Sequence, residues 1–280
     1  MLDNMAVDRI ILNALEEDLG WGDITTDSTI PEHVEIKGNF IAKEEGVICG
    51  VSVCSRVFQL LDESIKFEAL MQDGRKASKG DIIATISGKA RSILKGERTA
   101  LNLFQRMSGI ATMTNRYAEK VSGFPVRIVD TRKTAPGLRI LDKYSVRVGG
   151  GFNHRYNLSD MVLIKDNHIK AAGGILPAVE AARSRVSHAV KIEVEVESLK
   201  ELREALEAGA DIIMLDNMPL DMMKEAVSIA KGKALLEASG NMGLEGGRNV
   251  RDVAETGVDI ISAGALTNSV DAMDISLRFL

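Results

Sequence analysis

The sequence predicts an α/β protein with two parts: a small N-terminal α+β domain and a larger C-terminal region of repeated βα units. Residues 38–88 hold short β-prone runs broken by glycines. After residue 125, six β-prone runs recur at spacings of roughly 20 to 35 residues, with helical segments such as 198–208 between them. Such units are expected to form a parallel sheet that closes as an incomplete α/β barrel of about six βα units.

The N-terminal domain is expected to begin with a helix over 8–19, where apolar residues recur at helical spacing before Gly20. Strands are expected within 39–42, 47–53 and 81–86. One apolar stripe predicts a long helix from about Gly96 to Val121; it comprises Ala100, Leu103, Phe104, Met107, Ile110 and Ala111. We expect domains at 1–110 and 111–270, and a tail at 271–280 that returns to the first domain.

The strands of the second domain are expected at the six runs, each of which ends in polar or glycine residues. Barrels carry their chemistry at the carboxyl ends of the strands. An open doubly wound sheet places ligands at the same ends, so spacing alone leaves both architectures open. The runs are 126–130, 161–165, 190–197, 211–216, 234–239 and 258–264.

Composition excludes several classes of protein. Of the 280 residues, 45% are hydrophobic and 27% charged, which is ordinary for a globular chain and excludes a disordered one. Aromatic residues make up 4% and the net charge is −5, so nucleic acid is not expected as a partner. The longest uncharged stretch, 260–270, is far shorter than the roughly 20 residues of a membrane span. No export signal is evident, so we expect no membrane partner and a cytoplasmic location, with Cys49 and Cys54 as reduced core residues.

The charge is unevenly distributed. Residues 91–170 contain 15 Lys and Arg against 6 Asp and Glu, a net +9 within an acidic chain. These cations lie among glycines and hydrogen-bonding residues, in runs such as 130–134 and 149–155, rather than in the Glu-to-Lys pairs of a solvated helix face. The pattern favours a pocket for small, highly anionic ligands over a solvated surface.

Alternation along 191–197 indicates inward-facing carboxylates. Val194 and Val196 would pack on helices, whereas Glu193, Glu195 and Glu197 would face the barrel interior. Buried carboxylates need partners, and Lys133 and Lys165 at neighbouring strand ends could supply them. A structural ring of ion pairs remains the alternative interpretation for Glu193, whereas Glu195 and Asp216 would share the barrel mouth with the cations.

Two loops of small residues follow the last two strands, where barrels commonly bind phosphate through backbone N–H groups. They indicate a phosphorylated ligand. His154 and His168 lack partners at metal-ligand spacing, so we expect hydrogen-bonding roles and no zinc site. No nucleophile elbow, Walker loop or dinucleotide fingerprint is present. The loops are 237–241 and 263–265.

Several longer motifs resemble the quinolinate phosphoribosyltransferase family, also called nicotinate-nucleotide pyrophosphorylase, over nearly the whole chain. The run Asp-Thr-Arg-Lys-Thr-Ala-Pro-Gly-Leu at 130–138 is the most specific. The others are Glu-Arg-Thr-Ala-Leu-Asn at 97–102, Ser-Gly-Ile-Ala-Thr at 108–112, Gly-Gly-Gly-Phe-Asn-His-Arg at 149–155, and Ile-Lys-Asp-Asn-His at 164–168. The resemblance implies the barrel fold and transfer of phosphoribose from phosphoribosyl pyrophosphate to quinolinate, with Mg²⁺ and loss of carbon dioxide, in NAD synthesis.

The resemblance also implies residue roles and an assembly. It implies a homodimer in which Arg98 reaches the neighbouring subunit's site, and it leaves further association into a hexamer of dimers open. The catalytic set would be Lys133, Glu195 and Asp216, around the ribose and pyrophosphate, and no metal ligand is assigned beyond Mg²⁺ arriving with the cosubstrate near Glu195 and Asp216. Quinolinate would be bound by Arg98, Arg132, His154, Arg155 and Lys165, with Thr131 beside them, and phosphate by Ser239, Gly240, Asn241, Ala263, Gly264 and Ala265.

One position departs from the family pattern, and three other functions stay open. Asn241 stands where the family commonly has Gly, and Asn tolerates unusual backbone angles better than most residues. Lys165 could instead act as a Schiff-base nucleophile of an aldolase-type barrel. The chain could also be a phosphate-binding regulator without turnover, or a relative that uses nicotinate or another pyridine.

Overall fold

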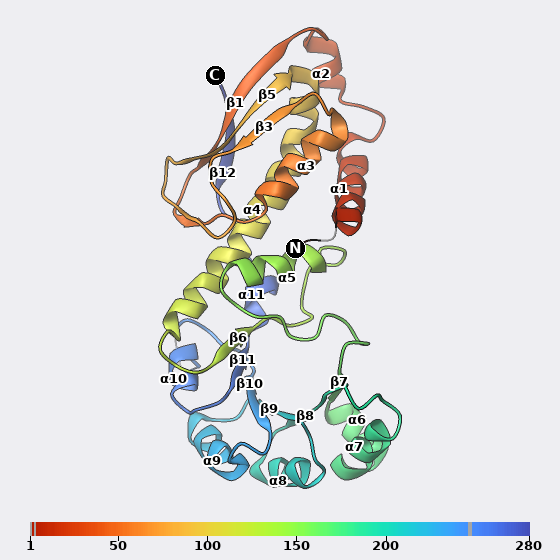
Figure 1. Cartoon of the computed structure of the whole chain (residues 1–280), viewed down its shortest axis with the longest axis vertical. Helices are drawn as coiled ribbons and strands as arrows, with labels where there is room; N and C mark the ends of the chain where they lie inside the picture. The colour runs from red at the N-terminus through yellow and green to blue at the C-terminus, as the bar shows by residue number, and fades with distance from the viewer. Residues whose placement is uncertain (1, 3, 246–247) are drawn as a thin grey trace. The chain divides into compact units, whose positions relative to one another are not determined.

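The computed structural model describes residues 2, 4–245 and 248–280, so residues 1 and 3 of the predicted first domain lie outside it. It divides the chain into two compact units (Figure 1). The first unit comprises residues 1–115, 134–150 and 269–280, and the second comprises 116–133 and 151–268. Each is described by itself.

The first unit is an α+β domain built on a four-stranded antiparallel sheet in the order β12-β1-β5-β3 (Figure 1). Its strands are β1 (Glu35–Ala42), β3 (Lys66–Ala69), β5 (Ile82–Lys89) and β12 (Ile275–Phe279), and a small ladder pairs β2 (Gly46–Val47) with β4 (Lys76–Ala77). Aromatic rings at the centre of its core pack edge to face, with the centroids of Phe40 and Phe104 6.4 Å apart. Its helices are α1 (Asn4–Leu19), α2 (Ile24–Thr29), α3 (Val51–Leu61), α5 (Arg139–Val148) and most of α4 (Ala90–Lys120).

Two predicted elements of this unit need correction. The run 47–53 is strand only to Val47, because Asp73 Oδ1 accepts the N–H groups of Gly50 and Val51, at 2.9 and 3.0 Å, and so caps helix α3. Helix α4 begins at Ala90 and runs through Gly96, where a Cβ atom would lie 2.8 Å from Leu61 Cδ1. Gly96 therefore allows α4 to pack closely against α3 and does not mark the start of the helix.

The two compact units do not follow a single cut in the chain, because residues 134–150 pack with the first unit. Helix α5 buries Leu141 in the core of that unit. Arg106 on α4 donates two hydrogen bonds, of 2.9 and 2.8 Å, to the fully buried carboxylate of Asp142. At the C-terminus, β12 pairs antiparallel with β1, from Gly38 opposite Phe279 to Ala42 opposite Ile275.

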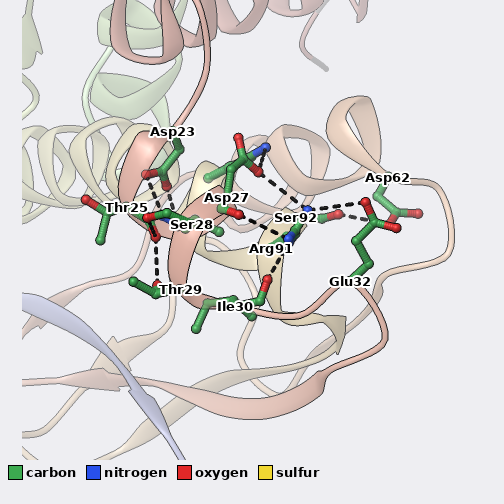
Figure 2. A network of polar contacts seen from close by, with 12 residues as sticks. Asp23, Thr25, Asp27, Ser28, Thr29, Ile30, Glu32, Asp62, Arg91 and Ser92 are labelled. Carbon is green, nitrogen blue, oxygen red and sulfur yellow. Dashed lines mark hydrogen bonds and ion pairs between the residues drawn. The ribbon is translucent and has the colours of Figure 1, made fainter.

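A polar network holds the start of α4 (Figure 2). Arg91 Nε donates to the carbonyl of Ile30 at 2.7 Å, and its guanidinium also reaches the carbonyl of Asp27 and the carboxylate of Glu32. The network fixes the first turn of α4. Arg98 lies on the same helix about two turns later, and its side chain is exposed.

The second unit is a six-stranded parallel sheet in the order β6-β11-β10-β9-β8-β7, which confirms the six predicted strands. Within this unit the first strand, β6, lies beside the last, β11, so the sheet curls into a barrel that its pairing leaves open between β6 and β7. Phe152 adds a single parallel bridge to Val129 there. The strands are β6 (Arg127–Val129), β7 (Val162–Ile164), β8 (Ile192–Val196), β9 (Ile212–Asp216), β10 (Leu235–Ser239) and β11 (Ile260–Ser262).

Helices follow the strands and cover the outer side of the sheet, with α8 packed on β8 and α9 on β10 (Figure 1). Val194, Ile213 and Ala238, which point toward the helices, are fully buried. No helix in the described part of the chain is long and apolar enough to cross a membrane. The helices are α6 (Asp166–Ala172), α7 (Ile175–Arg183), α8 (Leu199–Glu207), α9 (Leu220–Ala230), α10 (Val250–Ala254) and α11 (Ala265–Asn268).

Candidate active site

The predicted site residues of the second unit gather at one end of its sheet. Because the strands are parallel, their carboxyl ends share an edge, and the side chains there face the barrel mouth. Lys165 follows β7 directly, Glu195 lies one residue before the end of β8, and Asp216 and Ser239 end β9 and β10 opposite one another in register. Residues 131–133 follow β6, and 263–265 follow β11.

A lysine and a carboxylate predicted to be partners form a direct ion pair. Lys165 Nζ lies 2.5 Å from Glu195 Oε2, and the Glu195 side chain is 12% exposed. His168 has the predicted hydrogen-bonding role, since its Nδ1 accepts the backbone N–H of Lys165 at 3.0 Å at the start of α6.

Lys133 lies against the loop after β11. Its backbone N–H donates to Thr131 Oγ1 at 3.0 Å, and its carbonyl accepts from Thr267 Oγ1 at 2.8 Å. The stem of Lys133 passes over Gly264, where an added Cβ atom would lie 3.0 Å from Lys133 Cδ. The fold therefore brings a predicted cation of the pyrophosphate site to the loop 263–265 predicted to hold phosphate.

The loop after β10 has backbone angles that favour Gly and Asn. Gly240 has φ +102°, and a Cβ atom there would lie only 2.2 Å from Asn217 Oδ1, so any other residue would be strained and would displace the Asn217 side chain. Asn241 adopts φ +44°, the left-handed region that Asn tolerates. Arg248 Nη1 donates to the carbonyl of Gly240 at 3.0 Å and to Asn217 Oδ1 at 3.2 Å. The sequence offered no signal for Arg248, whose partner Asn217 lies 31 residues earlier in the chain.

Two predicted arginines lie close enough to influence each other. Burial lowers the pKa of the Arg155 guanidinium, and the positive charge of Arg132 lowers it further. Arg155 is half-buried and Arg132 is exposed. Two neighbouring cations in a partly desolvated position are stabilised when an anion binds between them, and a guanidinium fork matches a carboxylate.

Beneath Arg155, His154 faces two buried carboxylates. His154 Nε2 lies 3.1 Å from Glu193 Oε2 and 3.3 Å from Glu237 Oε2, and both glutamate side chains are at most 1% exposed. Asp130, also fully buried, accepts the backbone N–H of His154 at 2.9 Å. We call His154, Glu193 and Glu237 the His154 cluster.

The cluster corrects two expectations. Glu193 points inward as predicted, but it contacts His154 and not a lysine, because the lysines lie at the strand ends and Glu193 lies deeper in β8. Glu237 was assigned to the phosphate loop, whereas it lies inside β10. The same alternation that identified Glu193 would have found it, since Leu236 and Ala238 on either side point to the helices.

Comparison with known proteins decides the family. The model of the quinolinate phosphoribosyl transferase C-terminal domain matches residues 110–278, and that of the N-terminal domain matches 23–108. The chain belongs to the quinolinate phosphoribosyltransferase family. It is 43% identical over 276 residues to the probable nicotinate-nucleotide pyrophosphorylase [carboxylating] of Bacillus subtilis, covering 99% of this chain and 94% of that protein. It is 45% identical over 288 residues to the chloroplastic enzyme of Arabidopsis thaliana, covering 96% and 81%. The solved structure of the nicotinate-nucleotide pyrophosphorylase from Francisella tularensis superposes with a TM-score of 0.94 at 42% identity, covering 100% of this chain and 98% of that chain.

Two predicted positions of this quinolinate phosphoribosyltransferase family member are not among the strand-end residues of the second unit. Arg98 belongs to the first unit, where it is exposed on α4. Glu197 was expected to face the barrel interior, but β8 ends at Val196 and Glu197 is exposed. Its backbone N–H donates to Glu201 Oε2 at 2.7 Å, at the start of α8.

Proposed function

We propose that this chain transfers phosphoribose from phosphoribosyl pyrophosphate to quinolinate and releases carbon dioxide, giving nicotinate mononucleotide and pyrophosphate in NAD synthesis. Its relatives carry the name of this enzyme. The observation that carries the proposal is the proximity of Arg132, in the loop after β6, to the half-buried guanidinium of Arg155. Two adjacent guanidinium groups match the two adjacent carboxylates of quinolinate better than they match a monocarboxylate.

The acceptor would lie against the cations that follow β6 and β7. Arg132 and Arg155 would each bind a carboxylate, and Lys165 would add a point charge while Glu195 holds its ammonium in place. Arg98 would complete the set from a neighbouring subunit. The predicted contact of His154 with quinolinate is replaced in this proposal, because the Nε2 edge of its ring faces Glu193 and Glu237.

The cosubstrate would lie along the loops after β10 and β11. Backbone N–H groups of 239–241 and 263–265 would hold its 5′-phosphate, and Lys133, which lies over Gly264, would neutralise the pyrophosphate as it leaves. Glu195 and Asp216 offer the carboxylate oxygens that Mg²⁺ prefers, so they fit the ion that accompanies phosphoribosyl pyrophosphate. Bound there, Mg²⁺ would neutralise charge on the pyrophosphate.

The chemistry follows from charge. The bond between ribose C1 and the pyrophosphate oxygen breaks, its electron pair leaves with pyrophosphate, and the pyridine nitrogen forms the new bond to C1. Glu195 and Asp216 would stabilise the positive charge that develops on the ribose. The ring is then a pyridinium, whose positive nitrogen stabilises the electron pair left on the adjacent carbon when carbon dioxide departs, and that carbon then takes a proton. A quenched single turnover should show a nucleotide that retains both carboxylates, whereas free nicotinate released first would contradict this order.

The proposal includes a homodimer. Trp21 and Ile24 in the first unit are large apolar residues with exposures of 108% and 85% of the reference value, as expected of surface that a second copy covers. Arg98 of one subunit would reach the site of the other. The proposal covers the dimer and leaves its association into larger rings open. The cytoplasmic location stays a prediction; Cys49 and Cys54 are buried and unpaired, as expected.

Turnover with two acceptors tests the proposal. Purified protein receives phosphoribosyl pyrophosphate, Mg²⁺ and either quinolinate or nicotinate, and pyrophosphate release is followed. Release with quinolinate alone is the expected result. Release with nicotinate alone would move the acceptor to a monocarboxylate, and absence of release with either would favour a binding protein without turnover.

A further inference from the structure

We propose that Arg248 is a positioning residue, which holds the carbonyl groups of the loop after β10 and thereby turns the N–H groups of Gly240 and Asn241 toward the 5′-phosphate of the cosubstrate. This inference rests on the proposed function for the molecule that carries the phosphate. It gives a role to a cation that lies outside the motifs of the sequence.

The first observation is the set of contacts that the half-buried Arg248 makes with two neighbouring loops. In the loop after β10, Nη1 donates to the carbonyl of Gly240 at 3.0 Å and to that of Ser239 at 3.5 Å. In the loop after β9, Nη2 donates to the carbonyl of Met218 and Nη1 to Asn217 Oδ1, both at 3.2 Å. A guanidinium is a rigid planar fork, so this one side chain fixes the two loops relative to each other.

The second observation is the direction of the peptide groups in the loop after β10. The C=O and N–H of a trans peptide point in opposite directions, and no described peptide is cis. The carbonyl of Ser239 shares a peptide with the N–H of Gly240, and the carbonyl of Gly240 shares one with the N–H of Asn241. Because Arg248 lies on the carbonyl side, both N–H groups face the opposite side of the loop.

Both of these N–H groups are available to a ligand. Within residues 4–245 and 248–280, neither the N–H of Gly240 nor that of Asn241 donates to another group of the protein. Successive N–H groups in a turn form a concave site for an anion. Arg248 therefore sets the direction of the donors that the proposed function assigns to the 5′-phosphate.

The backbone of the two loops needs such a restraint. The φ angles of Asn217, Gly240 and Asn241 are +52°, +102° and +44°, and residues other than glycine keep such angles only where their surroundings hold them. The carbonyl of Ser239 has a second donor in the N–H of Asn217, at 3.1 Å, whereas among the described residues the carbonyl of Gly240 accepts from Arg248 alone. A Cβ atom at Gly240 would lie 3.0 Å from Arg248 Nη1, so the lack of a side chain there lets the guanidinium approach the carbonyl.

The backbone of Arg248 is itself held in place. Its carbonyl accepts the N–H of Gly243 at 3.0 Å, and the carbonyl of Gly243 accepts the N–H of Val250 at 2.9 Å. Between them, Asn249 caps α10 by accepting the N–H of Arg251 at 2.9 Å. The guanidinium therefore reaches the loop from a fixed point on the chain.

Direct contact of Arg248 with the phosphate is the alternative role. Both terminal nitrogens already donate to carbonyl groups, and the N–H groups that would hold the phosphate face away from the guanidinium. The geometry thus favours an action through the loop over a direct contact.

Binding of ribose 5-phosphate to the whole protein tests this role without turnover. The probe carries the 5′-phosphate but no pyrophosphate, and its Kd is measured by calorimetry beside that of quinolinate. Arg248→Met removes the donors but keeps most of the side-chain length, so Kd for ribose 5-phosphate should rise by about 10- to 100-fold, and Kd for quinolinate by less than about threefold. Arg248→Lys keeps the charge but cannot bridge two loops, so most of the loss should remain.

A matched control and a fold check accompany these variants. Arg251 lies on α10 with a side chain that is 58% exposed, and Arg251→Met should bind both ligands as wild type does. Thermal unfolding shows which variants are folded, and Arg248→Lys, the milder change, decides the test if Arg248→Met does not fold.

The outcomes keep this inference apart from the proposed function. Unchanged binding of ribose 5-phosphate to Arg248→Met, full recovery in Arg248→Lys, equal losses for both ligands, or no binding of ribose 5-phosphate to wild type would each overturn the inference. Turnover of wild type with quinolinate is measured alongside. Selective loss of ribose 5-phosphate binding without wild-type turnover contradicts the proposed function alone, whereas turnover together with unchanged binding in Arg248→Met contradicts this inference alone.

Discussion

Replacing Arg155 by Ala should weaken the acceptor selectively. A hydrogen bond to a charged group contributes about 1.5–3 kcal/mol, and the guanidinium fork of Arg155 would make two to one carboxylate. Part of this is offset, because removing Arg155 also relieves its repulsion with Arg132 in the free enzyme. A net loss of about 2–3.5 kcal/mol corresponds to a rise of about 30- to 400-fold in KM for quinolinate.

The assay measures KM for each substrate with the other held saturating, and follows pyrophosphate. KM for phosphoribosyl pyrophosphate should change by less than about threefold, since Arg155 would touch one substrate only. Arg155→Lys should recover little, because an ammonium group cannot bind a carboxylate in two places. Arg203→Ala, an exposed position on α8, is the matched control. Equal losses for both substrates would refute the assignment of Arg155 to the acceptor.

Three further predictions concern the chemistry, the assembly and stability. Glu195→Gln should lower kcat by about 100-fold with smaller effects on either KM, and an unchanged kcat would remove Glu195 from the reaction. Arg98→Ala and Glu195→Gln proteins, each with little activity alone, can be mixed so that their subunits exchange. If Arg98 acts across a dimer, the mixed dimers contain one complete site each, and about a quarter of wild-type activity should return. If Arg98 acts within its own chain, no activity should return. Hydrogen bonds from Ser64 lower the pKa of Asp62 to about 2, from an ordinary value of 3.8. The ionised Asp62 therefore stabilises the fold above pH 3.8, and this stabilisation is lost as the pH falls toward 2. Asp62→Asn should therefore unfold at lower denaturant than wild type at pH 7, with the difference shrinking between about pH 4 and 2, and a constant difference would contradict the assignment.

Local periodicity explains why most of the fold was predictable. The six barrel strands are apolar runs that end in polar residues, and their hydrophobic pattern survives in the structure as Ile213 and Val194 packed beneath helices. Helix α3 was missed because Asp73, far along the chain, caps its first turn. The placement of α5 depended on the distant pair of Arg106 and Asp142, which no local pattern reveals.

The candidate site was predictable where motifs are contiguous and unpredictable where it is assembled across strands. The pairing of Lys165 with Glu195 followed from strand-end positions, and the structure confirms it. The contact of His154 with Glu193 and Glu237 joins three elements, and only the three-dimensional register brings them together. The sequence showed that carboxylates point inward but not which group would meet them.

The most direct test of the account counts the two small products of one reaction. With quinolinate labelled in the carboxyl group next to the ring nitrogen, together with phosphoribosyl pyrophosphate and Mg²⁺, labelled carbon dioxide and pyrophosphate are measured from the same sample. The account predicts equal amounts of both and a nucleotide product that retains one carboxylate. Pyrophosphate without labelled carbon dioxide, or carbon dioxide in the absence of phosphoribosyl pyrophosphate, would contradict it.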